Sequence, residues 1–283
     1  MSLEEKKKLK ILDLIKGYTG HKIVKLLSRG NAAIFSALFI AKKNNPKPFL
    51  LIPDQGGWIS FQNYPQMLGF GLRTIKTNRG VIDLIDLEEK ASSGSALILT
   101  SFAGYFAEQP LSYISNICKK HKCLIIEDAS GSIGDSVLCN SEFSDIIVGS
   151  FGKWKPVNNE YGGFLALSNK QMFEKAKDVF SADKFYPFYD KLLVNLSKVS
   201  DRMIKNLELQ SKVKKDLLEL DLKVLHSDKR GLNVVVKPFK MDDRKKILSY
   251  CEKNNYEYVE CPKYIRIEED AISIELKRLN FDK

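Results

Sequence analysis

The chain has 283 residues, 44% of them hydrophobic, which is enough to bury a sizeable core in one or two domains. Its formal net charge is +10, but the basic residues are dispersed among acids, which argues against a nucleic-acid-binding surface. Five scattered cysteines and three histidines favour neither a disulfide framework nor a metal centre, and no apolar run is long enough to predict a membrane span.

The first residues predict a helix rather than a targeting segment. Residues 1–16 are charged, and Leu9, Leu12 and Ile15 fall on one side of a helix. The segment lacks the continuous apolar stretch and the small-residue cleavage site of a signal peptide. We therefore expect a cytoplasmic protein.

Short apolar runs alternate with helical patterns over the next 150 or so residues, as in α/β proteins. The runs predict strands at residues 23–27, 49–52, 72–76, 96–101, 123–126, 146–150 and 164–167. Helical patterns cover residues 31–42 and 111–120. This order predicts a mostly parallel sheet with helices on both faces, whose ligands bind beyond the carboxyl ends of the strands.

The remainder of the chain changes character twice. Residues 169–220 have a helical pattern with an expected break at Pro187, and residues 191–220 predict one long helix. Expected strands at residues 232–236, 264–267 and 271–276 then surround a helix that begins near Asp242. We therefore predict a large domain (1–168), connecting helices (169–220) and a small C-terminal α+β domain (221–283).

The strongest pattern is an acid and a lysine that follow neighbouring strands. One buried run ends in Glu127 and Asp128, and the next strand ends at Ser150, shortly before Lys153 and Lys155. Successive strand residues point to opposite faces, and a buried carboxylate is costly unless it is paired or bound to a ligand. Pyridoxal phosphate needs a lysine for a Schiff base and an acid that keeps a proton on its pyridine nitrogen. The pattern therefore predicts a site for this cofactor.

Other features agree with this prediction, although each has a plainer interpretation when taken alone. A glycine turn opens the helix at residue 31, where free amide groups of Asn31 and Ala32 favour a phosphate. Trp58 follows a strand that stops at Pro53 and would stack on a flat ring. The Ser150 hydroxyl would donate a hydrogen bond to the phosphate. Taken singly, these features are common as a strand-to-helix turn, a core tryptophan or a solvated lysine. Only their combination predicts a cofactor site.

The combination resembles the DegT/DnrJ/EryC1/StrS family of pyridoxal-phosphate-dependent sugar aminotransferases over about residues 20–170. The run Gly30-Asn31-Ala32-Ala33 is similar to the family's Gly-Thr-Ala-Ala turn. The run 127–131, Glu-Asp-Ala-Ser-Gly, resembles its Glu-Asp-Ala-Ala-Gln. Ser150-Phe151, Lys155 and Gly162-Gly163 follow the spacing of its lysine motif without a gap.

The resemblance implies a fold-type-I pyridoxal-phosphate transferase, a homodimer, and amino transfer from a small-molecule donor to a nucleotide-linked keto sugar. It makes Lys155 the Schiff-base lysine and Asp128 the pyridinium partner. It also implies that Trp58 stacks on the ring, and it assigns the phosphate to the three residues Asn31, Ala32 and Ser150. Other fold-type-I branches use Ser-x-x-Lys, which leaves Lys153 as the alternative lysine.

Several positions depart from the family pattern. Gly131 stands where the family has a glutamine, Ile133 where it has a histidine, and Pro156 where an asparagine often follows the lysine. The asparagine and arginine segment that a partner subunit lends has no clear match near residues 185–202. The alternative function is therefore a catalytically degenerate relative that acts as a binding or scaffolding protein.

Arg266 has two possible roles. It lies in an expected late strand, where the aspartate-aminotransferase branch of fold type I places an arginine for a substrate carboxylate. The other interpretation is a surface arginine paired with Glu268 or Glu275.

Overall fold

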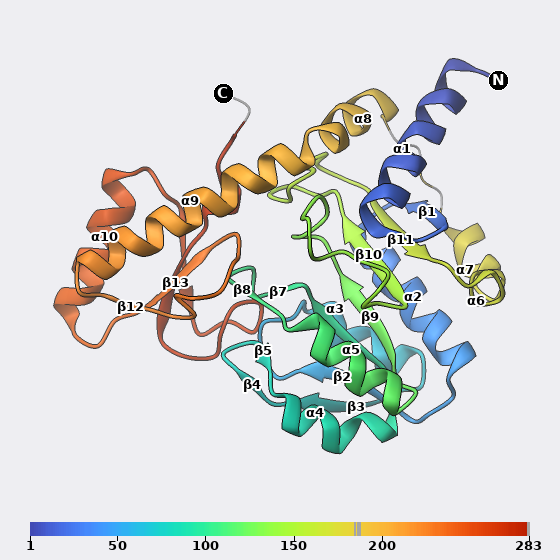
Figure 1. Cartoon of the computed structure of the whole chain (residues 1–283), viewed down its shortest axis with the longest axis horizontal. Helices are drawn as coiled ribbons and strands as arrows, with labels where there is room; N and C mark the ends of the chain where they lie inside the picture. Colours follow the sequence, from blue (N-terminus) through green and yellow to red (C-terminus); the bar gives the residue numbers. More distant parts are fainter. Residues whose placement is uncertain (184, 186–187, 282–283) are drawn as a thin grey trace.

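The computed structural model describes residues 1–183, 185 and 188–281. Its large lobe is built on a seven-stranded sheet with the order β1-β11-β10-β9-β6-β2-β3 (Figure 1). The strands are β1 (Ile23–Leu27), β2 (Phe49–Pro53), β3 (Gly71–Ile75), β6 (Gly94–Thr100), β9 (Leu124–Asp128), β10 (Ile146–Ser150) and β11 (Gly163–Leu167). Neighbouring strands pair in parallel except β11, which is antiparallel to β1 and β10. The predicted α/β fold with a mostly parallel sheet is confirmed.

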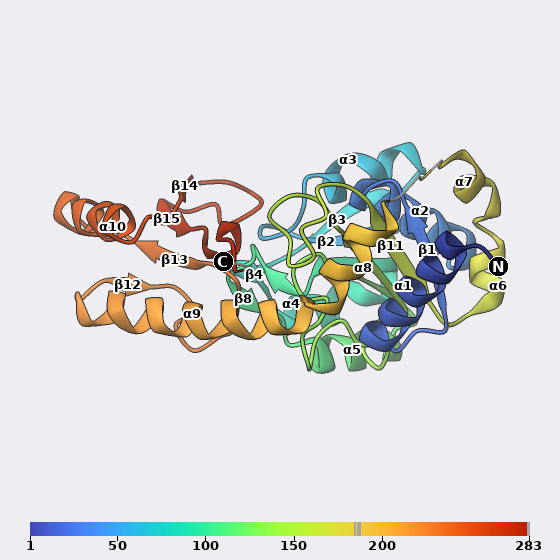
Figure 2. The same cartoon turned by 90° about the horizontal axis from the view of Figure 1, so that it is seen from above.

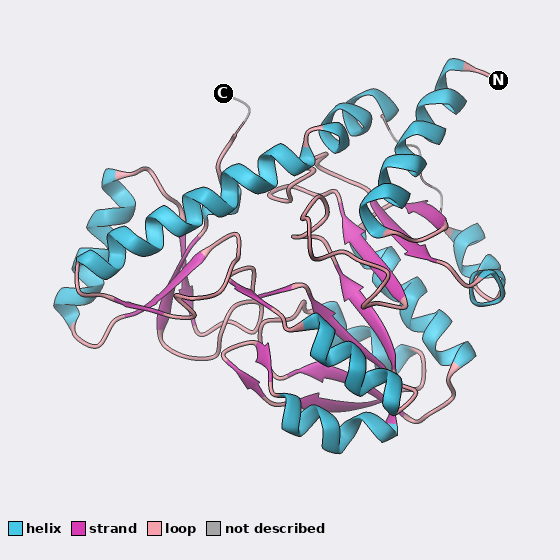
Figure 3. Ribbon diagram, viewed as in Figure 1, coloured by secondary structure: helices cyan, strands magenta, loops and turns pink. Residues whose placement is uncertain are grey.

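Helices cover both faces of this sheet, as Figure 3 shows. On one face, α2 (Gly30–Asn44) and α3 (Ser60–Met67) pack on the sheet, and α2 lies on β10 and β11. On the other face lie α1 (Leu3–Thr19), α4 (Leu84–Lys90), α5 (Leu111–Lys120) and α8 (Tyr189–Ser197). The strands bury apolar side chains on both faces, which explains their continuous apolar runs.

Shorter elements complete the large lobe. Two hairpins, β4 (Thr77–Asn78) with β5 (Val81–Ile82) and β7 (Phe102–Ala103) with β8 (Ala107–Glu108), lie beyond the sheet on the side of the small lobe. The remaining short segments are η1 (Ala91–Ser93), α6 (Lys170–Glu174) and α7 (Lys177–Ala182). None of the described helices is long and apolar enough to cross a membrane.

The small lobe is a four-stranded antiparallel sheet with the order β12-β13-β15-β14. Its elements are β12 (Lys223–Val224), β13 (Val234–Lys237), α10 (Met241–Lys253), β14 (Tyr258–Cys261), β15 (Ala271–Ile274) and η2 (Leu276–Arg278). A core of α9 (Val199–Glu219), α10 and this sheet stabilises the lobe. Seen from above, α9 runs from the large lobe along the length of the small one (Figure 2).

The lobes meet through the β7–β8 hairpin. Phe106 and Ala107 share an apolar cluster with Val235 and Ile267 of the small lobe. A Cβ on Gly231 would lie 2.5 Å from the Phe106 backbone, so only glycine permits this approach. The backbone N–H of Leu232 donates to the Tyr105 carbonyl at 2.7 Å, which fixes the hairpin against the small lobe.

Two expectations for the C-terminal part are wrong, and a third falls outside the described residues. The single helix expected over 191–220 is wrong, because α8 and α9 are separate helices with Lys198 between them. The strand expected at 264–267 is also wrong: the strand is β14, and Pro262, which lacks an N–H to donate, follows it directly. The break expected at Pro187 falls outside the described residues.

Candidate functional site

A pocket of about 310 Å³ opens where β9 and β10 end, between these strands and the start of α2. Ligands of parallel sheets usually bind at this position, beyond the carboxyl ends of the strands. Five of the residues that the sequence singled out line it: Asn31, Trp58, Asp128, Ser150 and Lys155. They come from four separate stretches of the chain, and the fold brings them together in one pocket.

Asp128 is the last residue of β9, the middle strand of the sheet, and only 5% of it is exposed. The Ser130 N–H donates to its Oδ1 at 3.0 Å. Burial raises the pKa of Asp128, while the Ser130 hydrogen bond and the positive charge of Lys155 oppose this shift. A cationic group in the pocket would stabilise the carboxylate further, since opposite charges favour the ionised form.

Glu127, its neighbour, belongs to a separate buried network. Its carboxylate accepts hydrogen bonds from the hydroxyls of Ser101 and Ser144, both at 2.7 Å, and from the Cys139 N–H at 2.8 Å. Burial raises the pKa of Glu127, and these three donors oppose the shift. Glu127 does not line the pocket, in keeping with the alternation of side chains along a strand. We assign it to the stability of the β9 end.

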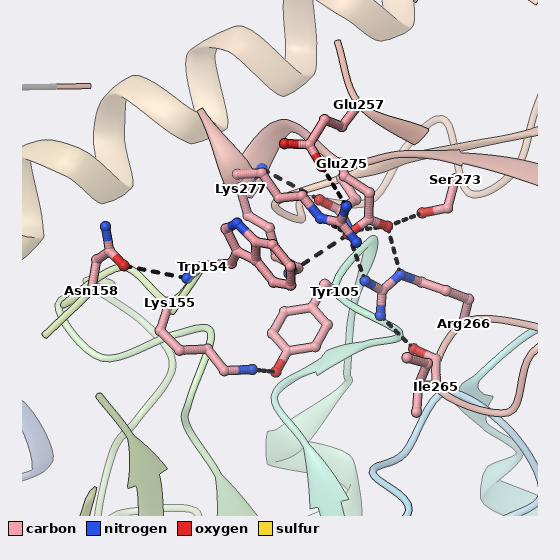
Figure 4. A network of polar contacts seen from close by, with 12 residues as sticks. Tyr105, Trp154, Lys155, Asn158, Glu257, Ile265, Arg266, Ser273, Glu275 and Lys277 are labelled. Carbon is pink, nitrogen blue, oxygen red and sulfur yellow. Dashed lines mark hydrogen bonds and ion pairs between the residues drawn. The ribbon is translucent and has the colours of Figure 1, made fainter. Parts of the chain in front are cut away.

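Lys155 lies on the loop between β10 and β11 and extends into the pocket. Its Nζ donates a hydrogen bond to the Tyr105 hydroxyl (Figure 4). The same Nζ lies 4.5 Å from the centre of the Tyr105 ring and 5.3 Å from that of Trp58. The amine is thus held between two aromatic side chains, on the pocket wall.

Lys153, the alternative lysine, has a different environment. It is exposed, and its Nζ lies 4.7 Å from the centre of the Trp154 ring. It does not line the pocket. The two lysines that the sequence left open therefore differ in position, and the geometry favours Lys155.

The start of α2 forms the end of the pocket that suits a phosphate. A Cβ on Gly30 would lie 2.6 Å from the Ser150 Cβ, so glycine lets the helix start approach the end of β10. Asn31 Oδ1 accepts hydrogen bonds from Trp58 Nε1 and the Ser60 hydroxyl, both at 3.0 Å. These bonds fix the indole to the helix start. Free N–H groups and the helix dipole favour an anion there.

Two further residues define this end. Ala32 follows in the same turn, but it does not line the pocket and packs partly against the core. Arg29, which the sequence analysis missed, is exposed, lines the pocket and adds a positive charge. An arginine before a helix is too common to have marked it.

Arg266 is buried, so its expected place on the surface was wrong. Its Nε and Nη2 donate to the two carboxylate oxygens of Glu275 at 2.8 and 2.6 Å, and its Nη1 donates to the Ile265 carbonyl at 2.7 Å (Figure 4). Only 3% of the residue is exposed, because its turn packs against the β7–β8 hairpin, where a Cβ on Gly104 would touch its backbone. The pairing with Glu275 expected as one alternative is present, and Arg266 does not line the pocket.

Tyr105 is the main residue that the sequence analysis did not assign to the site. It lines the pocket, and a Cβ on Gly131 would lie 3.0 Å from its ring. A side chain at position 131 would therefore require the ring to shift by a few tenths of an ångström. This contact gives a physical reason for glycine at a position where the family pattern has glutamine.

Comparisons with known proteins support the resemblance. Residues 56–185 match the model of the DegT/DnrJ/EryC1/StrS aminotransferase family, which confirms the resemblance over that part of the chain. Residues 200–283 match a second model, that of the MJ1341 family C-terminal domain, which the sequence analysis did not foresee. None of the curated proteins shows a significant match to the chain.

Solved structures with the same fold are numerous. The aminotransferase PseC of Helicobacter pylori, involved in the biosynthesis of pseudoaminic acid, is 16% identical, with 98% of this chain and 87% of that one covered and a TM-score of 0.75. NtdA of Bacillus subtilis with bound cofactor PMP is 15% identical, with coverage of 97% and 74% and a TM-score of 0.72. Serine palmitoyltransferase of Sphingomonas wittichii is 16% identical, with coverage of 95% and 70% and a TM-score of 0.72. At this identity the likeness shows the fold.

Proposed function

We propose that the pocket binds pyridoxal 5'-phosphate and that the protein is an aminotransferase, which moves an amino group from a small-molecule donor to a keto acceptor. The observation that carries this proposal is the presence of a buried acid, Asp128, and an amine, Lys155, in the wall of one pocket. The family match over residues 56–185 supports it. As the acceptor we propose a nucleotide-linked keto sugar, since the net charge of +10 suits a diphosphate.

The residues of the pocket fit this cofactor. Its volume of about 310 Å³ is at the lower end of the usual range for small-molecule and cofactor sites. Asp128 is a buried acid whose carboxylate form a protonated ring nitrogen would stabilise. Trp58 would lie against the ring, with Asn31 holding the indole in place. The phosphate would bind at the start of α2, near the Ser150 hydroxyl and Arg29.

When bound, pyridoxal phosphate supplies an electron sink that lets the α-carbon of an amino acid lose a proton. Asp128 would keep the proton on the ring nitrogen, and Lys155 would hold the cofactor covalently through Nζ. The Nζ of the free lysine would be the base that moves the proton at the donor's α-carbon. Tyr105 would orient the amine through its hydroxyl.

A half-reaction assay tests the proposal. Purified protein is mixed with pyridoxal phosphate and then with glutamate, aspartate or alanine, and the absorbance of the cofactor is followed. We expect at least one amino acid to convert the aldehyde form to the amine form and to leave its keto acid in solution. Failure of the protein to bind the cofactor would overturn the proposal.

The second candidate function is a catalytically degenerate relative that binds or scaffolds. The departures at Gly131 and Ile133 favour it, because Ile133 is buried in the apolar core and only 1% exposed. It predicts cofactor uptake without conversion by any amino acid of the panel. Turnover with glutamate would exclude it.

We further propose a homodimer in the cytoplasm. Sites of fold-type-I enzymes are usually built between two subunits, which the resemblance implies for this chain. The segment that would carry partner-lent residues, near 185–202, lies in part outside the described residues.

A further inference from the structure

A second pocket lies beside the cofactor pocket and shares Lys155 with it. It is enclosed by the loop at 154–158, by α9 and by η2 with the segment that follows it, and its cavity of about 40 Å³ has room for a small anionic group. The first wall belongs to the large lobe, and η2 belongs to the small lobe (Figure 4). A molecule that reacts at Lys155 would therefore have this pocket within reach.

The walls of this second pocket are strongly basic. Lys155, Arg202, Lys277 and Arg278 line it, and no acidic side chain does so among the described residues. Behind this wall lies the buried acid Glu275, which is shared by three cations. Its carboxylate binds Arg266 at 2.6 Å and lies 3.6 Å from Lys277 Nζ and 3.5 Å from Arg278 Nε.

Glu275 is already neutralised by its first partner. Burial raises its pKa, but the charges of Arg266 and Lys277 outweigh this and lower it to about 2, so it is ionised at neutral pH. Arg266 binds it through two hydrogen bonds. The exposed Glu257 pairs with Arg278 at 2.6 Å. Lys277 therefore has only a weak ion pair, with the Glu275 carboxylate at 3.6 Å.

Lys277 is the unusual member of this group. Only 7% of its side chain is exposed, and its Nζ lies 4.9 Å from the centre of the Tyr105 ring. The charged groups that face it are Glu275, which follows β15, Arg266 from the turn after β14, Arg278 from η2 and Lys155 from the large lobe. Burial, reinforced by the three cations and opposed by Glu275, lowers its pKa to about 7.

A buried amine among cations is an arrangement that an anion would complete. Asn206 of α9, which also lines the pocket, adds a second sign of a missing ligand. Its Oδ1 is buried and has no hydrogen-bond partner among the described residues, although buried polar atoms are nearly always paired. A ligand with an oxyanion for Lys277 and a hydroxyl or N–H for Asn206 would satisfy both.

We propose that this second pocket binds an anionic group of the substrate, with Lys277 as the residue that receives it. The inference rests on the proposed function, since it places the substrate beside Lys155. The anion is an oxyanion, either the carboxylate of an amino or keto acid or the phosphate of a phosphorylated acceptor. Lys277 must gain a proton to bind it, so the affinity falls as the pH rises through 7.

Calorimetry with two probe anions tests this proposal on protein loaded with pyridoxal phosphate, which blocks the first pocket. Glutarate stands for a carboxylate, and sulfate stands for a phosphate with a charge that does not change between pH 6 and pH 8. We expect at least one to bind, with an affinity that falls about tenfold between these values, because the protonated fraction of an amine with a pKa of about 7 falls by that factor. The probe that binds identifies the source of the oxyanion.

Two variants make the test specific. Lys277→Met should weaken binding about tenfold or more and remove the pH dependence, since it deletes a charged partner. Lys245→Met removes the same charge from the exposed side of α10 and should change neither. Absence of binding by both anions, or wild-type binding by Lys277→Met, overturns the proposal.

The outcome is separable from that of the proposed function. If the protein takes up no pyridoxal phosphate, the same titrations are made without it. Anion binding that depends on Lys277 would then retain the second pocket while the aminotransferase proposal fails. Cofactor uptake with anion binding that is independent of Lys277 gives the reverse result.

Discussion

The Tyr105 ring is surrounded by three cations. The charged groups of Lys155, Arg266 and Lys277 lie 4.5, 5.2 and 4.9 Å from its ring centre. Aromatic rings attract cations, and this contact offsets part of the repulsion among them. The backbone φ of Tyr105 is 69°, in the left-handed region that non-glycine residues seldom adopt. The β7–β8 hairpin thus holds a strained residue in the wall of the cofactor pocket.

Only part of this arrangement of residues could be predicted from sequence patterns. Asp128, Ser150 and Lys155 follow neighbouring strands, so their proximity could be predicted from the order of apolar runs. Tyr105 lies in the turn of the β7–β8 hairpin and Lys277 in η2 of the other lobe, so their contact depends on how the lobes pack. The packing of the lobes cannot be predicted from the spacing of residues in the sequence.

Replacing Lys277 with methionine should stabilise the protein near neutral pH. The folded state binds fewer protons than the unfolded state between about 7 and the usual lysine value of 10.5, so the cost of the buried amine is largest at or below pH 7 and fades toward 10.5. We expect a gain on the order of a few kcal/mol in the free energy of unfolding at pH 7. Denaturant unfolding of both proteins from pH 6 to pH 10 measures it, and a gain that does not shrink with rising pH would contradict the account.

Asp128→Asn should separate catalysis from stability. Without cofactor, burial raises the pKa of Asp128, so the folded wild type binds more protons than the unfolded chain just above the usual value of 3.8, and its stability falls as the pH rises through that window. The variant should lose this dependence and be no less stable at pH 7. Its half-reaction should slow by roughly a hundredfold or more, since the proton on the ring nitrogen is lost. An active variant would remove Asp128 from the proposed mechanism.

At the scale of elements, the strands of the large sheet could be predicted because each is a buried apolar run with clear ends. The strand β14 could not, since Tyr258 and Glu260 are exposed at an edge of the small sheet. The apolar pattern at 264–267 reports burial rather than a strand: Ile267 is fully buried in the contact between the lobes. Burial patterns therefore misplace elements at such contacts.

The start of α2 offers a test of the phosphate end. Gly30→Ala would place a Cβ 2.6 Å from the Ser150 Cβ, so the helix start must move away from β10. We expect a loss of about 1–3 kcal/mol in the free energy of unfolding and weaker binding of pyridoxal phosphate. Titration of the cofactor and thermal unfolding measure the two effects.

The chain contains a matched control for this variant. Gly17 lies within α1, and a Cβ there would meet nothing within 4 Å. Gly17→Ala should stabilise the helix by about 0.5–1 kcal/mol and leave cofactor binding unchanged. Equal effects of the two substitutions would argue against a specific role for Gly30.

At the scale of the whole molecule, the two family matches meet at the second pocket. Trp154 and Lys155 fall in the part that matches the aminotransferase family, whereas Arg202, Lys277 and Arg278 fall in the part that matches the second model. The division into domains at residues 168 and 220 stays a prediction, since α9 packs with the small lobe and also lines this pocket. Both matched parts therefore contribute residues to the second pocket.

The predicted homodimer is tested by light scattering across a range of protein concentrations, with and without pyridoxal phosphate. We expect twice the mass of one chain, with dissociation only on strong dilution. A stable monomer that still converts the cofactor would show that one chain holds the complete site.

Borohydride reduction tests whether Lys155 attaches the cofactor. Protein mixed with pyridoxal phosphate is reduced, digested and mapped, with Lys155→Ala and Lys153→Ala treated in parallel. We predict one modified peptide that carries the label on Lys155, kept in Lys153→Ala and lost in Lys155→Ala. A label on Lys153 or another lysine, or no label, would contradict the account.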